Sequence, residues 1–226
     1  MNPQGKLILT AASEFLVSDL ALQQGVIAKA VDYYSPFGLD IYVAVAAGSK
    51  DKILRSGNEF GSKASIEEVP LGTRGAMATA VCALSKVGFE SGELFIAAGD
   101  TYFTGDSALD GMDKLRHSEF EAGTLVFPSS DDRHSFVAFD AQGAAQLVAE
   151  KQKIGPNATS GNFYFASSGD FLKAAEWCFV NNSTHKGNFY VSGALNFFIY
   201  QGRSVGVSLI DPAQVEKHWP NSVSER

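Results

Sequence analysis

The sequence has few of the side chains that form disulfides and zinc sites. Its two cysteines, Cys82 and Cys178, each lie in an apolar segment with helical character. Buried free thiols in a reducing compartment are therefore expected. The four histidines are widely scattered: His117, His134, His185 and His218. Their spacing and the lack of a Cys-x-x-Cys pattern argue against zinc.

Positive charge is also in short supply. Lys and Arg total 18 against 25 Asp and Glu, which gives a formal net charge of −7. Such a chain does not build a surface that tracks phosphates, so DNA and RNA are not expected partners. An acidic protein that handles nucleotides usually does so through a metal ion, because its carboxylates alone would repel phosphate.

Long apolar runs are absent as well. No run approaches the roughly 20 residues that span a bilayer, and no basic segment followed by a long apolar core is evident near the start. We therefore expect a soluble cytoplasmic protein without membrane insertion. A length of 226 residues with 45% hydrophobic and 19% charged residues predicts one domain over residues 1–226.

The first half alternates apolar strand-like runs with helical segments. Near-continuous apolar strands are typical of a parallel sheet that helices cover on both faces. The helix that starts at Asp19 should stop at Ser35-Pro36, because proline disfavours helix in the residue before it. The pattern predicts strands at 6–12, 41–47, 64–69 and 93–100, and helices at 19–38, 50–57 and 72–88.

The second half has a different pattern. Alternating residues around a turn at 140–143 predict a hairpin within 134–151. We also expect strands at 122–130, 160–168 and 204–211, and helices at 169–182, 191–202 and 211–219. The whole predicts an α/β fold with three α/β/α layers around a mostly parallel, mixed central sheet.

Two carboxylates close predicted strands. Asp100 follows Gly99 at the end of the strand 93–100, and Asp211 closes the strand 204–211. Ligands collect at the carboxyl ends of parallel strands, and a carboxylate there suits Mg²⁺, which keeps one or two carboxylates plus substrate phosphates. The alternative for each residue is a cap on the following turn or helix.

Two further motifs offer ligand contacts. Gly72 and Gly75 form a loop that opens a helix, where backbone N–H groups suit an anion or a nucleobase edge. Glu150 could accept hydrogen bonds from sugar hydroxyls, and Lys151 could neutralise a phosphate. The alternatives are a glycine-shaped turn and an exposed charged pair that ends a strand.

The order of these motifs resembles the sugar-phosphate nucleotidyltransferases of the GT-A-like, nucleotide-diphospho-sugar transferase fold. The similarity is greatest to small bacterial members of capsule and surface polysaccharide synthesis or phosphocholine activation. GTRGA, a strand ending in GD, SFVAFD with a turn leading to EK, SGNFYF, FYVS and ID follow one another over roughly residues 40–216. The resemblance implies transfer of a nucleotidyl group from an NTP to a sugar phosphate or similar phosphorylated alcohol, with release of pyrophosphate.

The same resemblance implies roles for individual residues and Mg²⁺ as cofactor. Related enzymes often self-associate, so a homo-oligomer is a further expectation. The implied nucleotide-binding residues are Gly72, Thr73, Arg74, Gly75 and Ala11. The implied substrate-binding residues are Glu150, Gly161 and Asn162. The implied catalytic residues are Asp100, Lys151 and Asp211, of which Asp100 and Asp211 would hold the metal.

The loop after the first strand departs from the family pattern. The family has a Gly-rich loop there, with an Arg and a Pro-Lys pair that hold the triphosphate. Residues 13–19 contain no Gly, Arg or Pro-Lys, while Glu14 and Asp19 add negative charge, and Lys29 lies within the predicted helix.

Three hypotheses therefore stay open. The first is an active nucleotidyltransferase with an unusual phosphate grip that uses Arg74 or a metal. The second is a non-catalytic relative that binds a nucleotide, a nucleotide-sugar or a partner protein and regulates. The third is a glycosyltransferase-like user of nucleotide-sugars, because a diphosphate donor needs less phosphate cradling than a triphosphate.

Overall fold

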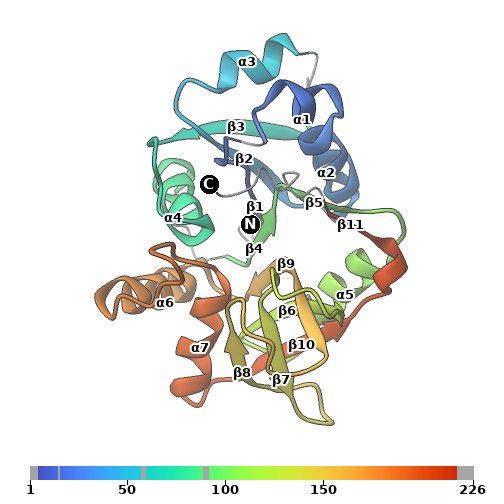
Figure 1. Cartoon of the computed structure of the whole chain (residues 1–226), viewed down its shortest axis with the longest axis vertical. Helices are drawn as coiled ribbons and strands as arrows, with labels where there is room; N and C mark the ends of the chain where they lie inside the picture. The colour runs from blue at the N-terminus through green and yellow to red at the C-terminus, as the bar shows by residue number, and fades with distance from the viewer. Residues whose placement is uncertain (1–4, 15, 57–59, 89–91, 218–226) are drawn as a thin grey trace.

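The computed structural model describes residues 5–14, 16–56, 60–88 and 92–217. In that part of the chain, a nine-stranded sheet has the central order β10–β6–β9–β4–β1–β2–β3, with β7 paired to β9 and β8 paired to β7 (Figure 1). Its strands are β1 (Lys6–Thr10), β2 (Asp40–Ala46), β3 (Ala64–Val69), β4 (Leu94–Ala98), β6 (Ala122–Pro128), β7 (Phe136–Phe139), β8 (Ala145–Ala149), β9 (Asn157–Phe165) and β10 (Val205–Leu209).

The sheet is mixed, with a parallel half and an antiparallel insertion. β1 pairs in parallel with both β2 and β4, and β2 pairs in parallel with β3. β9 runs antiparallel between β4 and β6, whereas β10 is parallel to β6. The predicted mostly parallel, mixed sheet is confirmed, and the hairpin expected around 140–143 is β7–β8.

Helices cover both faces of this sheet. α4, α6 and α7 pack on one face, whereas α1, α2 and α5 pack on the other (Figure 1). The helices are α1 (Asp19–Gln23), α2 (Val26–Tyr34), α3 (Lys50–Arg55), α4 (Ala76–Val87), α5 (Ser107–Arg116), α6 (Ser168–Val180) and α7 (Ser192–Tyr200). The three-layer α/β/α arrangement is therefore as predicted.

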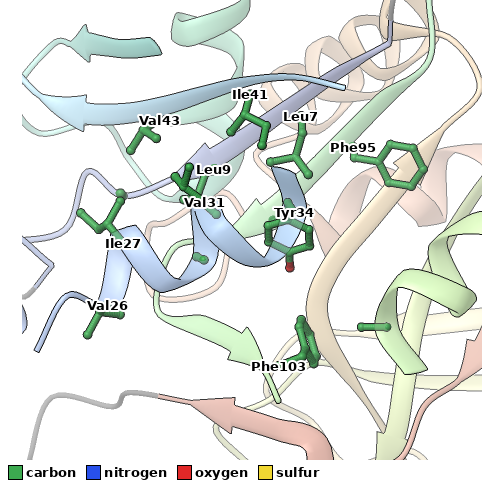
Figure 2. Packing of buried hydrophobic residues seen from close by; sticks show 14 of the residues in the cluster. Leu7, Leu9, Val26, Ile27, Val31, Tyr34, Ile41, Val43, Phe95 and Phe103 are labelled. Atoms are coloured by element: carbon green, nitrogen blue, oxygen red, sulfur yellow. The ribbon is translucent and has the colours of Figure 1, made fainter. Parts of the chain in front are cut away.

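Alternation along each strand divides the core in two. Leu7 and Leu9 of β1 belong to the cluster that includes Val31 and Tyr34 of α2 (Figure 2). Ile8 faces the opposite side and belongs to the cluster that includes α4, α6 and α7. Successive side chains of a strand point to opposite faces, so an apolar run such as KLIL is buried on both sides. Each large apolar side chain buried in this way contributes about 1.5–3 kcal/mol.

The single helix predicted at 19–38 is divided. Gly25 separates α1 from α2 with a backbone φ of 63°, in the left-handed region that glycine adopts without steric cost. α2 ends at Tyr34, and Ser35–Phe37 continues as the 3₁₀ turn η1, which contains Pro36. The stop at Ser35-Pro36 is therefore confirmed, while the continuous helix is wrong. The helix expected at 50–57 is α3, with residue 57 outside the described residues.

The last predicted helix, 211–219, is also wrong where it is described. Pro212–Gln214 form the 3₁₀ turn η2, and Val215–Lys217 form strand β11. β11 pairs antiparallel with β5 (Thr101–Phe103), and this pairing gives the segment partners that a helix would not. Residues 218 and 219 lie outside the described residues. Among the described helices, none has the length and apolarity to cross a membrane.

Candidate functional site

A cavity of about 510 Å³ opens beyond the carboxyl ends of β1 and β4. It lies on the face of the sheet that α4 and α7 cover, since residues of both helices line it. The strand order reverses at this point, because β2 and β3 follow on one side of β1 whereas β4 pairs on its other side. Open α/β sheets bind ligands at such a reversal.

Three neighbouring strands form the floor. Thr10 of β1 lies opposite Ala98 of β4, and Gly161 of β9 lies next to Ala98 on the other side. Asp100 follows β4 at the cavity wall, is half-buried, and its Oδ1 accepts a hydrogen bond from Thr101 Oγ1 at 3.0 Å. The structure therefore brings the predicted Asp100 and Gly161 into one space.

The 72–75 loop forms one wall with Thr73 and Gly75. The Thr73 hydroxyl lies 2.8 Å from that of Thr79, which lines the cavity from the first turn of α4. Gly75 has φ 90° and ψ 173°, and an added Cβ there would lie 2.4 Å from the carbonyl oxygen of Phe189. The same Phe189 oxygen accepts the amide of Met77, so part of the N-terminus of α4 is already hydrogen-bonded within the protein.

Gly72 and Arg74 of this loop do not line the cavity. Arg74 is exposed, its Nε donates to the Gly187 carbonyl at 2.8 Å, and its guanidinium lies 5.2 Å from the centre of the Phe189 ring. Arg74 therefore ties the 72–75 loop to the segment before α7. The expectation that Arg74 grips a phosphate finds no support in this geometry.

The opposite wall carries Glu150 and Lys151. Glu150 Oε2 accepts hydrogen bonds from Ser135 Oγ and, at 2.7 Å, from Ser192 Oγ. Lys151 has a left-handed backbone with φ 52°, and its Nζ lies 5.0 Å from the centre of the Tyr190 ring. Both residues are half-buried, so they form a fixed part of the wall and not an exposed pair at a strand end.

Strand alternation keeps two predicted residues away from the cavity. Thr10 and Gly161 line the cavity, and their neighbours Ala11 and Asn162 face the other side of the sheet. Asn162 Oδ1 accepts the Tyr34 hydroxyl at 2.7 Å in a buried contact. Burial raises the pKa of Tyr34, so this hydroxyl stays protonated and donates. Ala11 and Asn162 are thus core residues, which corrects their predicted contacts with nucleotide and substrate.

Asp211 also lies outside the cavity lining. Its Oδ1 accepts the amide of Ala213 at 2.9 Å, which caps η2, and its side chain is exposed. The alternative of a cap is what the structure shows. The predicted second metal carboxylate is therefore not placed beside Asp100.

The side chains of the cavity suit a metal ion only if a bound ligand supplies further oxygen atoms to it. Among the described residues, no group of three or more His, Cys, Asp or Glu side chains could hold a metal. Asp100 offers one carboxylate at a strand end, and Mg²⁺ is often bound by one carboxylate together with substrate phosphates. Asp100 fits a Mg²⁺ ion that is shared with ligand phosphates. The described residues do not fit a metal site built from protein side chains alone.

Two groups of cavity residues had no predicted site role. Arg133, His134 and Ser135 precede β7, and the segment from Asn188 to Ser192 leads into α7. Arg133 binds the Asp131 carboxylate, with Nη2 to Oδ2 at 2.6 Å, and this contact lowers the pKa of Asp131 to about 2. A sequence signal was available, because Ser135 begins the motif SFVAFD and Tyr190 to Ser192 belong to the motif FYVS.

The first loop forms a wall and leaves the cavity open. Ser13 and Leu16 line the cavity on this side. Asp19 forms an ion pair with Lys52, with 3.0 Å between Oδ1 and Nζ. In the described residues of 13–19 there is no cation and no glycine, so this wall offers no charged grip for phosphates.

Comparisons with known proteins identify this architecture. No family model matches the sequence, and no curated protein sequence does. Solved structures do match. A nucleoside-diphosphate-sugar pyrophosphorylase from Vibrio cholerae RC9 has 17% identity and a TM-score of 0.69, with 94% of each chain covered. The chain has the GT-A-like fold of that structure.

Two further structures with this fold are also similar along nearly the whole chain. The inositol-1-phosphate CTP transferase from T. maritima has 16% identity and a TM-score of 0.69, over 95% of this chain and 89% of that one. The 4-diphosphocytidyl-2C-methyl-D-erythritol synthase from Anaerococcus prevotii DSM 20548 has 14% identity and a TM-score of 0.66, over 96% and 93%. Identities this low show the GT-A-like fold and leave the activity to the site.

Proposed function

We propose that this protein is a cytoplasmic nucleotidyltransferase. It transfers a nucleotidyl group from an NTP to a sugar phosphate or similar phosphorylated alcohol, releases pyrophosphate, and so makes a precursor of surface polysaccharide. One observation carries the proposal: a single cavity gathers Thr73 and Gly75, Asp100, and Glu150 and Lys151 from three separate segments of the chain.

Different walls of the cavity contact different parts of the two substrates. Thr73 and Gly75 contact the nucleoside, and Glu150 and Gly161 contact the acceptor, whose phosphate charge Lys151 neutralises. An oxygen of the acceptor phosphate attacks the α-phosphorus, a new P–O bond forms, and the bond to the leaving pyrophosphate breaks. The attacking phosphate is already an anion, so the step needs no general base. Mg²⁺ held by Asp100 and the nucleotide would supply further charge neutralisation at the α-phosphate.

Pyrophosphate release tests this proposal. The purified protein is incubated with each of several NTPs and sugar 1-phosphates, with and without Mg²⁺. We expect Mg²⁺-dependent release with one combination, and a loss of about a hundredfold or more in Asp100→Ala, because a carboxylate at the metal is removed. Asp113→Ala is the matched control, since Asp113 is exposed on α5 and outside the cavity. No release with any combination, or equal release by both variants, would contradict the proposal.

The first loop favours a second candidate. Its described residues lack a glycine and a cation, so a triphosphate has little to hold its β- and γ-phosphates on that side. A relative that binds a nucleotide or a nucleotide-sugar without turnover, in a regulatory role, does not need that grip. A GT-A glycosyltransferase-like user of nucleotide-sugars needs less of it. Stabilisation by nucleotide without pyrophosphate release would favour the former, and stabilisation by nucleotide-sugars alone the latter.

A further inference from the structure

The positive charge of the cavity lies on one side. Among the described residues that line it, the arginine and lysine side chains are Arg133 and Lys151. The wall formed by the first loop contributes Ser13 and Leu16, which carry no charge. In the described part of the cavity lining, an anionic group of a ligand therefore finds lysine and arginine on the side of Glu150.

A hydrogen bond joins the two segments that carry these cations. In the β7–β8 hairpin Phe136 pairs with Ala149, which places Ser135 next to Glu150. Ser135 Oγ donates to Glu150 Oε2 across the hairpin. Arg133 lies two residues before Ser135, and Lys151 directly follows Glu150. The two cations therefore flank the Ser135–Glu150 hydrogen bond.

The cations are also held in place on this wall. Arg133 Nε and Nη2 bind the Asp131 carboxylate, with Nε to Oδ1 at 2.9 Å. Lys151 lies against the Tyr190 ring and has a left-handed backbone, with φ 52°. Such a backbone costs about 1–3 kcal/mol in a non-glycine residue and persists only where the surroundings impose it.

We infer that Arg133 and Lys151 together bind the phosphate group of the acceptor. The planar guanidinium presents several N–H donors to phosphate oxygens, and the ammonium adds a compact charge. That the bound phosphate belongs to an acceptor rests on the proposed function, whereas the anion site itself does not. Arg133, which no motif of the family order includes, thus makes a phosphorylated acceptor preferable to a neutral alcohol.

Binding of inorganic phosphate tests the site without any nucleotide. The affinity is measured by calorimetry on the full chain, at constant ionic strength with chloride as the competing anion. We expect Arg133→Gln and Lys151→Gln each to weaken phosphate binding about tenfold or more, since each removes a charge-assisted contact. Lys153→Gln removes the same charge from an exposed neighbour outside the cavity and should bind like the wild type.

The variant Asp131→Asn distinguishes a loss of phosphate binding from a loss of local structure. This variant and Arg133→Gln both break the Asp131–Arg133 ion pair, but only Arg133→Gln removes the cation. We expect Asp131→Asn to bind phosphate about threefold more tightly, because a carboxylate that competes for the guanidinium is neutralised. Equal weakening in both variants would overturn the inference, as would a loss confined to Lys151→Gln or wild-type binding no stronger than that of chloride. Phosphate binding without pyrophosphate release would leave this anion site standing while the proposed function fails.

Discussion

Among single residues, Gly75 tolerates the least change in the cavity wall. Its φ of 90° and ψ of 173° belong to a region that is essentially restricted to glycine. A Cβ at this position would also lie 2.4 Å from the Phe189 carbonyl oxygen, a backbone atom that cannot move alone. We expect Gly75→Ala to lower the free energy of unfolding by about 2 kcal/mol or more, as measured by urea denaturation.

Gly72 provides the matched control in the same loop. Its φ is also positive, at 73°, but an added Cβ would meet no atom within 4 Å. Gly72→Ala should therefore lose only the left-handed backbone preference, about 1 kcal/mol. Equal losses in the two variants would show that the contact with Phe189 does not matter.

At the same scale, the motifs named several residues that line one cavity but did not fix which face of its strand each residue takes. Thr73, Gly75, Asp100, Glu150, Lys151 and Gly161 all line the cavity, and their roles in binding and catalysis stay predictions. Ala11 and Asn162 lie one residue from cavity residues and face the core, because strand side chains alternate. A shift of one residue reverses the face, and a motif taken from a family does not fix that register.

At the scale of elements, Arg203 joins three segments. Its guanidinium contacts Glu121, before β6, at 2.7 Å and Asp170, in the first turn of α6, at 2.6 Å. The hydrogen bonds from Arg203 lower the pKa of both carboxyl groups. We expect Arg203→Gln to lower the free energy of unfolding by about 2 kcal/mol at pH 7, measured by urea denaturation.

The pH dependence gives this prediction its control. A carboxyl group with a lowered pKa in the folded state adds stability above its unfolded pKa and loses it as the pH falls through the folded value. The difference between wild type and Arg203→Gln should therefore shrink below about pH 4, where the unfolded carboxyls gain protons. A remainder is expected, because the Arg203 side chain also packs on the Phe198 ring at 4.5 Å. A difference independent of pH would contradict the ion-pair explanation.

Elements with strong periodicity were predictable, and those that depend on distant partners were not. α5 contains Gly111, a poor helix former, and went unpredicted. The segment from Asp211 onward has a helix-like composition, yet its residues 215–217 pair with β5, more than one hundred positions earlier. Local preference is a weak guide where a strand finds a tertiary partner.

The whole molecule explains why Asp211 differs from Asp100. β4 lies next to β1 at the reversal of strand order, whereas β10 is the outer strand of the order, beyond β9 and β6. Both aspartates follow strands, but the cavity lies beside β1 and β4. Sequence order does not reveal where a late strand enters a sheet, so the equivalence of the two carboxylates could not be tested before the topology was known.

The whole molecule also predicts how ligands should stabilise it. A ligand at one hundred times its dissociation constant adds about 2.7 kcal/mol, which is roughly 5–10 °C in the melting temperature for a chain of this length. We expect such a shift for the preferred NTP with Mg²⁺ and a much smaller one with EDTA, because the described first loop has no cation for the β- and γ-phosphates.

The nucleoside monophosphate is the control that distinguishes binding of the nucleoside from metal-dependent binding of the triphosphate. Its contacts are expected at Thr73 and Gly75, so its smaller shift should persist in EDTA and in Asp100→Asn. The same variant should lose the Mg²⁺-dependent part of the NTP shift, because Asp100 is the carboxylate at the end of β4 in the cavity. An NTP shift that is equal with EDTA and with Mg²⁺ would contradict this account, since the protein would then hold the triphosphate through groups other than a metal at Asp100.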